Sequence, residues 1–203
     1  MRSGPGLRER KNAAVKEAFF EAALALFREK GFEETSVDEI ADRAGFSRAT
    51  FFNHFGTKQG VLRYYGQRLQ SQMEHLLREA DPSSSPLERI REMLLVMARE
   101  ADRLGEEVRL IYLISMQDLD YFARPTDARM RVLEMVRELV VEAQERAAVR
   151  RDLSASQLAL HMLTVYNSAI LAAISGWGRA EHLVQSAWEF ILDGVRGGDR
   201  LDH

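Results

Sequence analysis

Apolar residues recur at three- and four-residue spacing along most of the chain, which is the periodicity of amphipathic helices. In the first such segment, residues 8–30, Val15, Phe19 and Leu26 follow this spacing, and Gly31 stands just past its end. A glycine in this place commonly closes a helix in the left-handed conformation. Sustained apolar–polar alternation between turn signals, the pattern of strands, is absent. We therefore predict an all-α protein.

Capping residues mark the next helices, because serine and threonine side chains accept hydrogen bonds from the exposed amides of a first turn. Thr35 and Ser36 precede an expected helix over 37–44, and Ser47 precedes one over 48–54. A long helix is expected from about 58 to 80. Its two glycines, at 60 and 66, either soften it as a hinge or permit close helix packing.

The second part of the chain predicts five further helices. Their starts follow from Ser85-Pro86 and from the Ser154–Gln157 capping box, and Gly176-Trp177-Gly178 provides a turn. The expected ranges are 86–103, 105–117, 126–149, 154–175 and 179–196, with a loop at 121–125. About nine helices are therefore expected in the whole chain.

No charged residue occurs from Ser154 to Gly178. A membrane span does not fit, because polar side chains such as Gln157 and Thr164 interrupt it. A helix that is apolar nearly all round is instead buried on two sides, and the second cover is most simply another subunit. We predict a homodimer through the last two helices, with Ala169, Ala172 and Ala173 allowing close approach and Trp188 as an anchor.

Composition and charge narrow the function classes. With 46% hydrophobic and 29% charged residues the chain is globular, and the absence of cysteine excludes disulfides and thiolate metal sites. Its start lacks the apolar stretch of a secretory signal, so we expect a cytoplasmic protein. The net charge is −3 overall, yet residues 1–63 hold eleven Lys and Arg against nine Asp and Glu. A basic end on an acidic body is compatible with phosphate binding or with a solvated tail.

Residues 37–54 have the pattern of a helix-turn-helix: a short helix, a turn carrying Gly45, and a second short helix. In such a unit the second helix presents its first residues to the major groove of DNA. The run FEETSVDEIADRAGFSRATFFNHFGTKQGVL, residues 32–62, closely resembles the DNA-binding domain of the tetracycline-repressor (TetR) family of transcriptional regulators. Matching extends over about residues 12–62.

This resemblance implies a helix-turn-helix DNA-binding domain at 1–56 and an effector-binding and dimerisation domain at 57–203. It also implies a homodimer that binds a palindromic double-stranded operator, usually as a repressor, and leaves it when a small molecule binds. The positions that it assigns to DNA contacts are Thr35 or Ser36, Ser47, Arg48, Ala49, Thr50, Asn53, His54 and Lys58. Phe52 departs from the pattern, since the family usually has a tyrosine there whose hydroxyl bonds a phosphate.

Seven of the eight methionines lie between 73 and 162. Methionine is flexible and suits surfaces that accommodate varied apolar partners, although any single one is more often core filler. With nearby aromatic and polar residues they predict an apolar effector pocket. Its expected members are Met73, Met93, Met97, Tyr112, Met116, Tyr121, Phe122, Met130, His161, Tyr166 and Asn167. The effector would be a lipid, an acyl-coenzyme A or an aromatic compound, with Arg124, Arg129 and Arg131 available for an acidic head group.

An enzyme is the rival class, and the motifs argue against it. None of the five histidines follows a glutamate by three residues, and no His-Glu-x-x-His, phosphate-binding glycine loop or nucleophile elbow occurs. We expect no catalytic residues, no metal and no cofactor. A third class is a helical adaptor that has kept the helix-turn-helix without operator binding, which the missing tyrosine leaves open.

Overall fold

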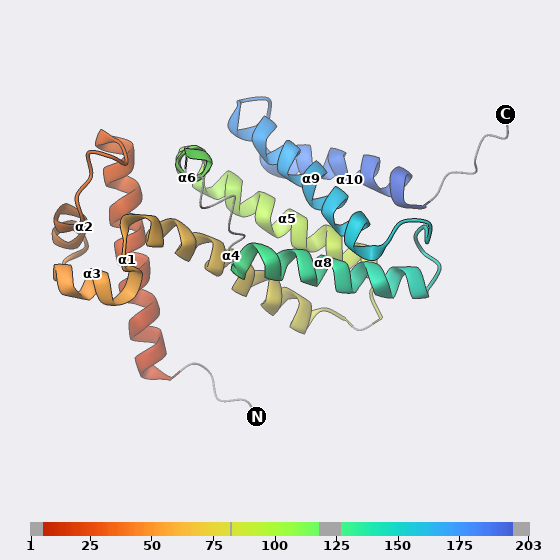
Figure 1. Cartoon of the computed structure of the whole chain (residues 1–203), viewed down its shortest axis with the longest axis horizontal. Helices are drawn as coiled ribbons and strands as arrows, with labels where there is room; N and C mark the ends of the chain where they lie inside the picture. Colours follow the sequence, from red (N-terminus) through yellow and green to blue (C-terminus); the bar gives the residue numbers. More distant parts are fainter. Residues whose placement is uncertain (1–5, 82, 118–126, 197–203) are drawn as a thin grey trace. The chain divides into compact units, whose positions relative to one another are not determined.

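The computed structural model describes residues 6–81, 83–117 and 127–196, and their regular secondary structure is helical throughout (Figure 1). The all-α prediction is confirmed. The helices are α1 (Leu7–Lys30), α2 (Val37–Ala44), α3 (Arg48–Phe55), α4 (Lys58–Glu79), α5 (Pro86–Leu104), α6 (Glu106–Gln117), α8 (Asp127–Glu145), α9 (Ala155–Ile174) and α10 (Ala180–Arg196). The expected loop at 121–125 lies outside the described residues.

Local capping signals account for most of these limits. The hydroxyls of Ser36, Ser47, Ser85 and Ser154 each accept a hydrogen bond from the backbone N–H three residues on. Gly31 and Gly45 take the left-handed conformation after α1 and α2, with φ of 89° and 75°. These caps satisfy amides and carbonyls that have no partner inside their own helix.

The predicted end of one helix, at residue 149, is wrong: α8 stops at Glu145. Ala147 has a positive φ of 53°, and the Arg150 amide donates to the Val195 carbonyl of α10 at 2.7 Å. The Gln144 side chain also turns back, donating to the carbonyls of Arg150 and Leu153 at 2.9 Å each. These contacts offer the backbone partners outside the helix, and only the fold brings those partners within reach.

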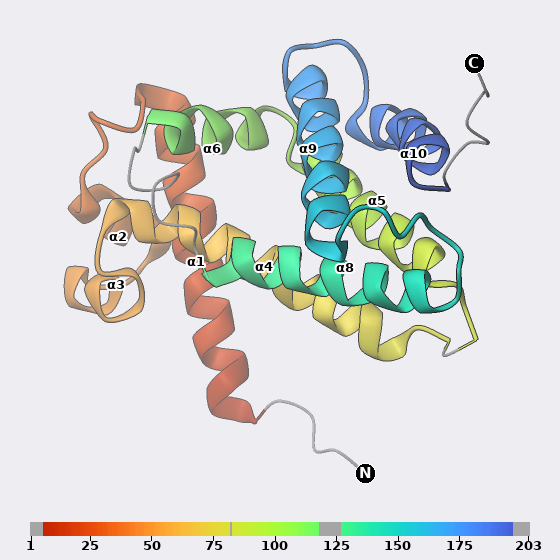
Figure 2. The same cartoon turned by 45° about the vertical axis from the view of Figure 1, so that its right-hand side comes forward.

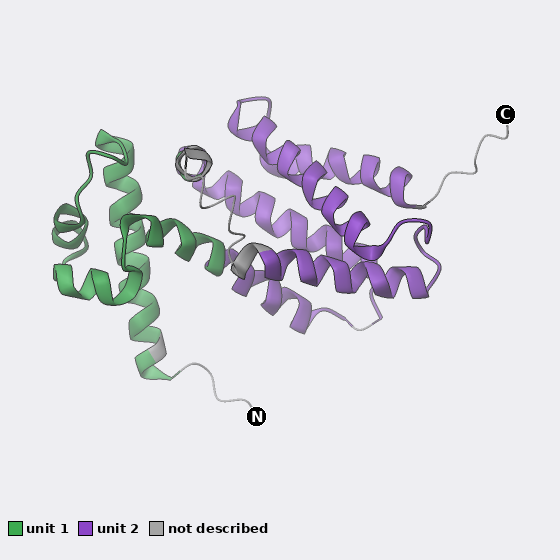
Figure 3. Ribbon diagram, in the orientation of Figure 1, with its two compact units in different colours: residues 1–67, 110–122 green, residues 68–109, 123–203 purple. Residues whose placement is uncertain are grey.

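The chain divides into two compact units, 1–67 with 110–122 and 68–109 with 123–203 (Figure 3). We call them unit 1 and unit 2. Unit 1 contains α1, α2, α3 and the beginning of α4, and α2 lies against both α1 and α3 (Figure 2). Phenylalanine rings fill its centre: the Phe19 ring lies 5.3 Å from Phe51 and 5.8 Å from Phe55, both edge-on. Edge-to-face packing of this kind holds the three helices in one arrangement.

Unit 2 is a helical bundle in which α9 packs on α8 and α10, and α5 on α8 and α10. Its interior is built from aliphatic side chains and methionines, with Met73, Met93 and Met162 almost fully buried. Trp188 is also buried there, at 3% exposure. Ion pairs join helices at the margin of this core, among them Arg68 of α4 with Glu100 of α5, and Arg89 of α5 with Glu142 of α8.

Candidate nucleic-acid interface

The first helix of the predicted helix-turn-helix is held by a reciprocal capping box. Ser36 accepts from the Glu39 amide at 3.2 Å, and the Glu39 carboxylate accepts from the Ser36 amide at 2.9 Å. The Lys30 ammonium and the amide and hydroxyl of Ser36 lower the pKa of Glu39 to about 2. At the other end the Gly45 amide donates to the Asp42 carbonyl at 3.1 Å, and the Phe46 amide to that of Ala41 at 3.0 Å. Both ends of α2 are therefore fixed, which sets the angle at which α3 follows.

The second helix, α3, presents a polar and open N-terminus. Ser47 caps it by accepting from the Thr50 amide at 3.1 Å, and the two hydroxyls share a hydrogen bond of 2.8 Å. Ser47, Arg48 and Ala49 are exposed, and Thr50 is partly exposed. No acidic residue stands in the first turn of α3. The partial positive charge of a helix N-terminus favours an anion such as phosphate here.

Arg48, the first residue of α3, does not project freely. Its Nη1 donates to both carboxylate oxygens of Asp38 in α2, at 2.7 and 3.1 Å. Its guanidinium carbon lies 5.4 Å from the centre of the Phe52 ring, one turn further along α3. Sequence reasoning missed Asp38. The available signal was an acid ten residues before Arg48, on the first helix of a helix-turn-helix, which must cross the helix that carries Arg48.

The two alternatives for the contact before α2 are separated by burial. Thr35 is 1% exposed, and its hydroxyl donates to the Gly31 carbonyl at 2.7 Å. That hydroxyl serves the end of α1 and is shielded from solvent, which favours Ser36 over Thr35 for the predicted contact. Ser36 is exposed and remains the predicted contact.

Lys58 has structural partners that explain a cation at the start of a helix. Its ammonium donates to the carbonyls of Phe32 and Glu33, at 2.7 and 3.2 Å, and lies 4.6 Å from the centre of the Phe32 ring. Lys58 therefore joins the start of α4 to the loop after α1. A phosphate contact by the same ammonium stays a prediction.

The remaining predicted contacts lie on the last part of α3. Asn53 is exposed and His54 is partly exposed, so both are accessible, and their contacts with DNA stay predictions. Phe52 is 41% exposed, while its neighbours Phe51 and Phe55 are buried in unit 1. Two rings of α3, Phe51 and Phe55, are thus buried, while the polar side chains from Ser47 onward face outward.

This arrangement agrees with a known family. Residues 19–65 match the sequence family described as "Bacterial regulatory proteins, tetR family". The helix-turn-helix segment of the chain is therefore of the tetR type. The matched segment runs from Phe19 in α1 to Tyr65 in α4, and so contains the complete helix-turn-helix.

Individual relatives are similar over different extents. The HTH-type transcriptional regulator TcmR of Streptomyces glaucescens is 41% identical over 59 residues, which cover 29% of this chain and 26% of that protein. The HTH-type transcriptional repressor BepR of Brucella suis is 26% identical over 192 residues, 91% of this chain and 88% of that one. The crystal structure of the Thermus thermophilus repressor FadR with lauroyl-CoA has a TM-score of 0.61 at 24% identity, covering 93% and 98% of the two chains. Identity is thus higher over the short match than over the nearly full-length ones.

The predicted effector residues that the structure describes differ widely in exposure. Met73 and Met93 are fully buried and Tyr166 nearly so, while Met97 and Tyr112 are partly exposed. Tyr121, Phe122 and the head-group candidate Arg124 lie outside the described residues, and the side chains of Met116 and Arg129 are not described either. Arg131 is exposed, with its Nη2 3.9 Å from Glu74.

Three predicted members of the pocket are on the surface of the chain. Met130 is 49% exposed, and His161 and Asn167 are exposed on α9. The prediction that these two polar residues face inward is wrong, because α9 turns a different stripe to its own bundle. That stripe contains Leu158, Ala159, Met162, Tyr166, Ala169 and Ile170.

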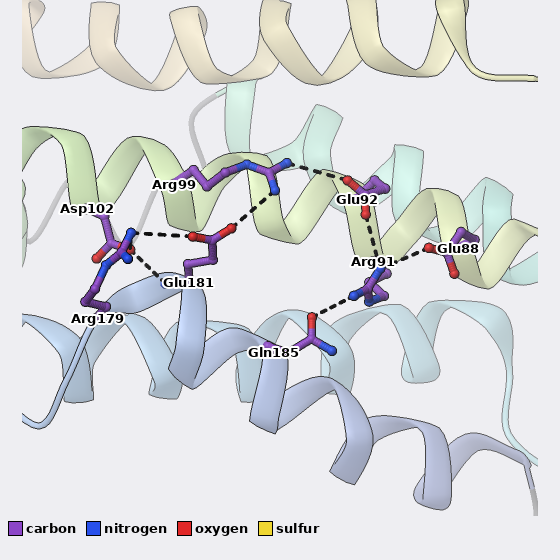
Figure 4. A network of polar contacts seen from close by, with 8 residues as sticks. All are labelled: Glu88, Arg91, Glu92, Arg99, Asp102, Arg179, Glu181 and Gln185. Atoms are coloured by element: carbon purple, nitrogen blue, oxygen red, sulfur yellow. Dashed lines mark hydrogen bonds and ion pairs between the residues drawn. The ribbon is translucent and has the colours of Figure 1, made fainter.

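Three cavities of unit 2 lie along α5 and the start of α10. The first, of about 410 Å³, is bordered by Asp102, Gly105 and Arg109 on one side and by residues 173–176 on the other. Two more, of about 420 and 450 Å³, follow the polar side chains drawn in Figure 4. There Arg99 reaches Glu92 and Glu181, and Arg91 reaches Gln185. None of these three cavities is bordered by a predicted effector residue.

One helix among the described residues, α9, is long and apolar enough to cross a membrane by composition, and 33% of its apolar window is buried within the chain. Leu160 and Leu171 on α9 are 54% and 44% exposed, and Phe190 on α10 is 71% exposed. Trp188 and Ala169, in contrast, face the interior of their own subunit. The prediction of Trp188 as an intersubunit anchor is therefore wrong.

Proposed function

We propose that the protein is a one-component transcriptional regulator that binds a palindromic operator as a homodimer, represses in its free form, and acts in the cytoplasm. The observation that carries this proposal is the exposed N-terminus of α3, capped by Ser47 and led by Arg48, within a segment that matches the tetR family. Repressor function is supported by the relative BepR, which is similar over most of both chains.

The homodimer is supported by the uncovered apolar side chains of α9 and α10. Leu160, Leu171 and Phe190 project from the two helices whose other faces build the core of unit 2. Exposed apolar patches of this kind mark interaction sites. A second copy of the same two helices would cover them and bring two α3 helices to one duplex, as a palindrome requires.

The effector is proposed to be a mainly apolar small molecule, of lipid, acyl or aromatic type. The supporting observations are the methionines buried in unit 2 and the complex that the structurally similar repressor FadR forms with lauroyl-CoA. To release DNA, the effector must bind more tightly to the conformation whose recognition helices do not fit the operator. Stabilisation of the free protein and loss of operator binding should therefore follow the same concentration range.

The test is selection of bound fragments from the source genome, followed by titration of the recovered promoter at several salt concentrations. We expect one dominant palindromic site whose affinity falls steeply with salt, because Lys and Arg release counterions from phosphates. Retention of fragments with no common sequence would contradict the proposal. It would favour the alternative function, that of a helical adaptor.

A further inference from the structure

Arg48, Asp38 and Phe52 form a cluster on the exposed side of unit 1, in which the Arg48 side chain is held from two directions. The side chains of Arg48 and Asp38 are 61% and 58% exposed, and their closest N–O distance is 2.7 Å. The Phe52 ring supports the guanidinium from beneath, at 5.4 Å. An arginine at the surface ordinarily samples many rotamers, so this restraint needs a reason.

Stability does not supply that reason. An ion pair this exposed contributes little to the free energy of unfolding, and so does a cation over an exposed ring. The cluster also leaves an acid, Asp38, beside the N-terminus of α3, where a phosphate would be repelled if the charge were unpaired. An acid in that place weakens general DNA binding, so its contribution must lie in what it does to Arg48.

The geometry of the guanidinium shows what the cluster achieves. Both hydrogen bonds to Asp38 come from Nη1, on one edge of the planar group. The edge formed by Nη2 and Nε takes no part in them. Two adjacent N–H groups on one edge are what an arginine uses to bind O6 and N7 of guanine in the major groove.

We infer that Asp38 and Phe52 are positioning residues that orient Arg48 for recognition of one guanine in each operator half-site. The inference rests on the proposed function and names the base that this site reads. It also assigns a role to Phe52, where the family usually has a tyrosine: the ring supports Arg48, and no hydroxyl is needed for that. Asp38 contributes specificity at the expense of general affinity.

The experiment is selection from random double-stranded DNA by the full-length protein, with the base preference measured at every position. Arg48→Ala identifies the guanine by abolishing one preference. Asp38→Asn should reduce the preference for that same guanine about fivefold or more, the low end of what a bidentate contact supplies. Its affinity for random DNA should stay equal or rise, because an acidic charge has been removed.

Glu29→Gln is the matched control. Glu29 pairs with Arg43 at 2.6 Å, is comparably exposed and belongs to the same unit, and its removal changes the net charge equally without touching α3. It should leave every base preference unchanged. Thermal melting confirms that each variant is folded.

Phe52 provides an independent second comparison. Phe52→Leu removes the ring and should relax the same guanine preference, whereas Phe52→Tyr keeps the ring and should retain it.

Several results would overturn the inference. An unchanged preference in Asp38→Asn or in Phe52→Leu, an equal loss in Glu29→Gln, or no guanine affected by Arg48→Ala would each do so. A rise in affinity for selected and random DNA alike, with specificity intact, would show that Asp38 only masks Arg48. Failure of the wild-type protein to select any sequence is a different outcome, because it overturns the proposed function itself.

Discussion

The two units solve the problem of packing helices with different side chains. Unit 1 uses phenylalanine: Phe19, Phe20, Phe27 and Phe51 are at most 1% exposed, and rings meet edge-on at 5–6 Å. Unit 2 uses Leu, Val, Ala and the flexible methionines, with ion pairs such as Arg68–Glu100 at the margin. Rings with two torsions fix one shape, whereas methionine adapts to several. A rigid unit suits reading a DNA sequence, and an adaptable one suits a variable ligand.

The largest expected effect is the loss of stability when a ring is removed from the phenylalanine core of unit 1. Phe51→Ala should destabilise unit 1 by about 3–5 kcal/mol, because the cavity left among fixed rings cannot collapse. Met93→Leu in unit 2, also at a fully buried position, should lose less than about 1.5 kcal/mol. Chemical denaturation followed by circular dichroism measures both, and equal losses would contradict the distinction.

The next effect concerns the uncovered side of unit 2. Leu171→Arg should leave the folded subunit intact, because Leu171 is 44% exposed there. In the proposed dimer it would bury an unpaired charge. We therefore expect the dimer dissociation constant to rise about a hundredfold, or about 3 kcal/mol. Sedimentation of the variant beside the wild type measures the shift. A wild-type monomer at micromolar concentration would contradict the dimer.

Gly60 tests how closely α4 approaches the end of α3. A Cβ at this position would lie 2.1 Å from the Phe55 carbonyl oxygen, so Gly60→Ala should lose about 1–3 kcal/mol. Gly194 in α10 has open space around it, and Gly194→Ala should gain about 0.4–1 kcal/mol. Thermal melting of the two variants separates close packing from the hinge alternative. A stable Gly60→Ala protein with altered DNA release would favour the hinge.

The DNA contacts differ in kind as well as in size. Arg48→Ala should weaken operator binding by about 1–3 kcal/mol and relax one base preference. Lys58→Ala should weaken all sequences similarly and reduce the slope of log K against log salt by about one. Lys58 also binds the carbonyls of Phe32 and Glu33, so its loss lowers the melting temperature in any case. A lower melting temperature with an unchanged salt slope would show a structural role alone.

The smallest effect is the pH dependence of unit 1. The pKa of Glu39 is lowered to about 2 by Lys30 and Ser36, from 4.5 in an unfolded chain. A depressed folded pKa means that this stabilisation is present above pH 4.5 and is lost as the pH falls towards 2. Glu39→Gln keeps the capping geometry without the charge, and should flatten the pH dependence of the melting temperature in this range. If the melting temperature fell equally at low pH in the wild type and in Glu39→Gln, the Glu39 carboxylate would make no contribution to the pH dependence.

Most helix limits were predictable from the sequence, since the signals act within one turn. Serine at 36, 47 and 154 caps the amide three residues later, and glycine at 31 and 45 closes a helix at its own position. The charge-free stretch from Ser154 to Gly178 likewise predicted a helix that is apolar nearly all round, but not which of its faces lies against its own bundle. The family resemblance at 32–62 was readable for the same reason, because a helix-turn-helix is a local motif.

What the tertiary structure alone decided involves partners far apart in the chain. The start of α10 has no capping side chain of its own, and Asp102 of α5 accepts from the amides of Ala180 and Glu181 at 2.7 and 3.1 Å. Contacts between distant segments likewise decide where α8 ends, that Trp188 points inward, and that Asp38 pairs with Arg48. Sequence periodicity shows that a side chain can be buried or paired. Which neighbour covers it depends on helix crossings that no local signal specifies.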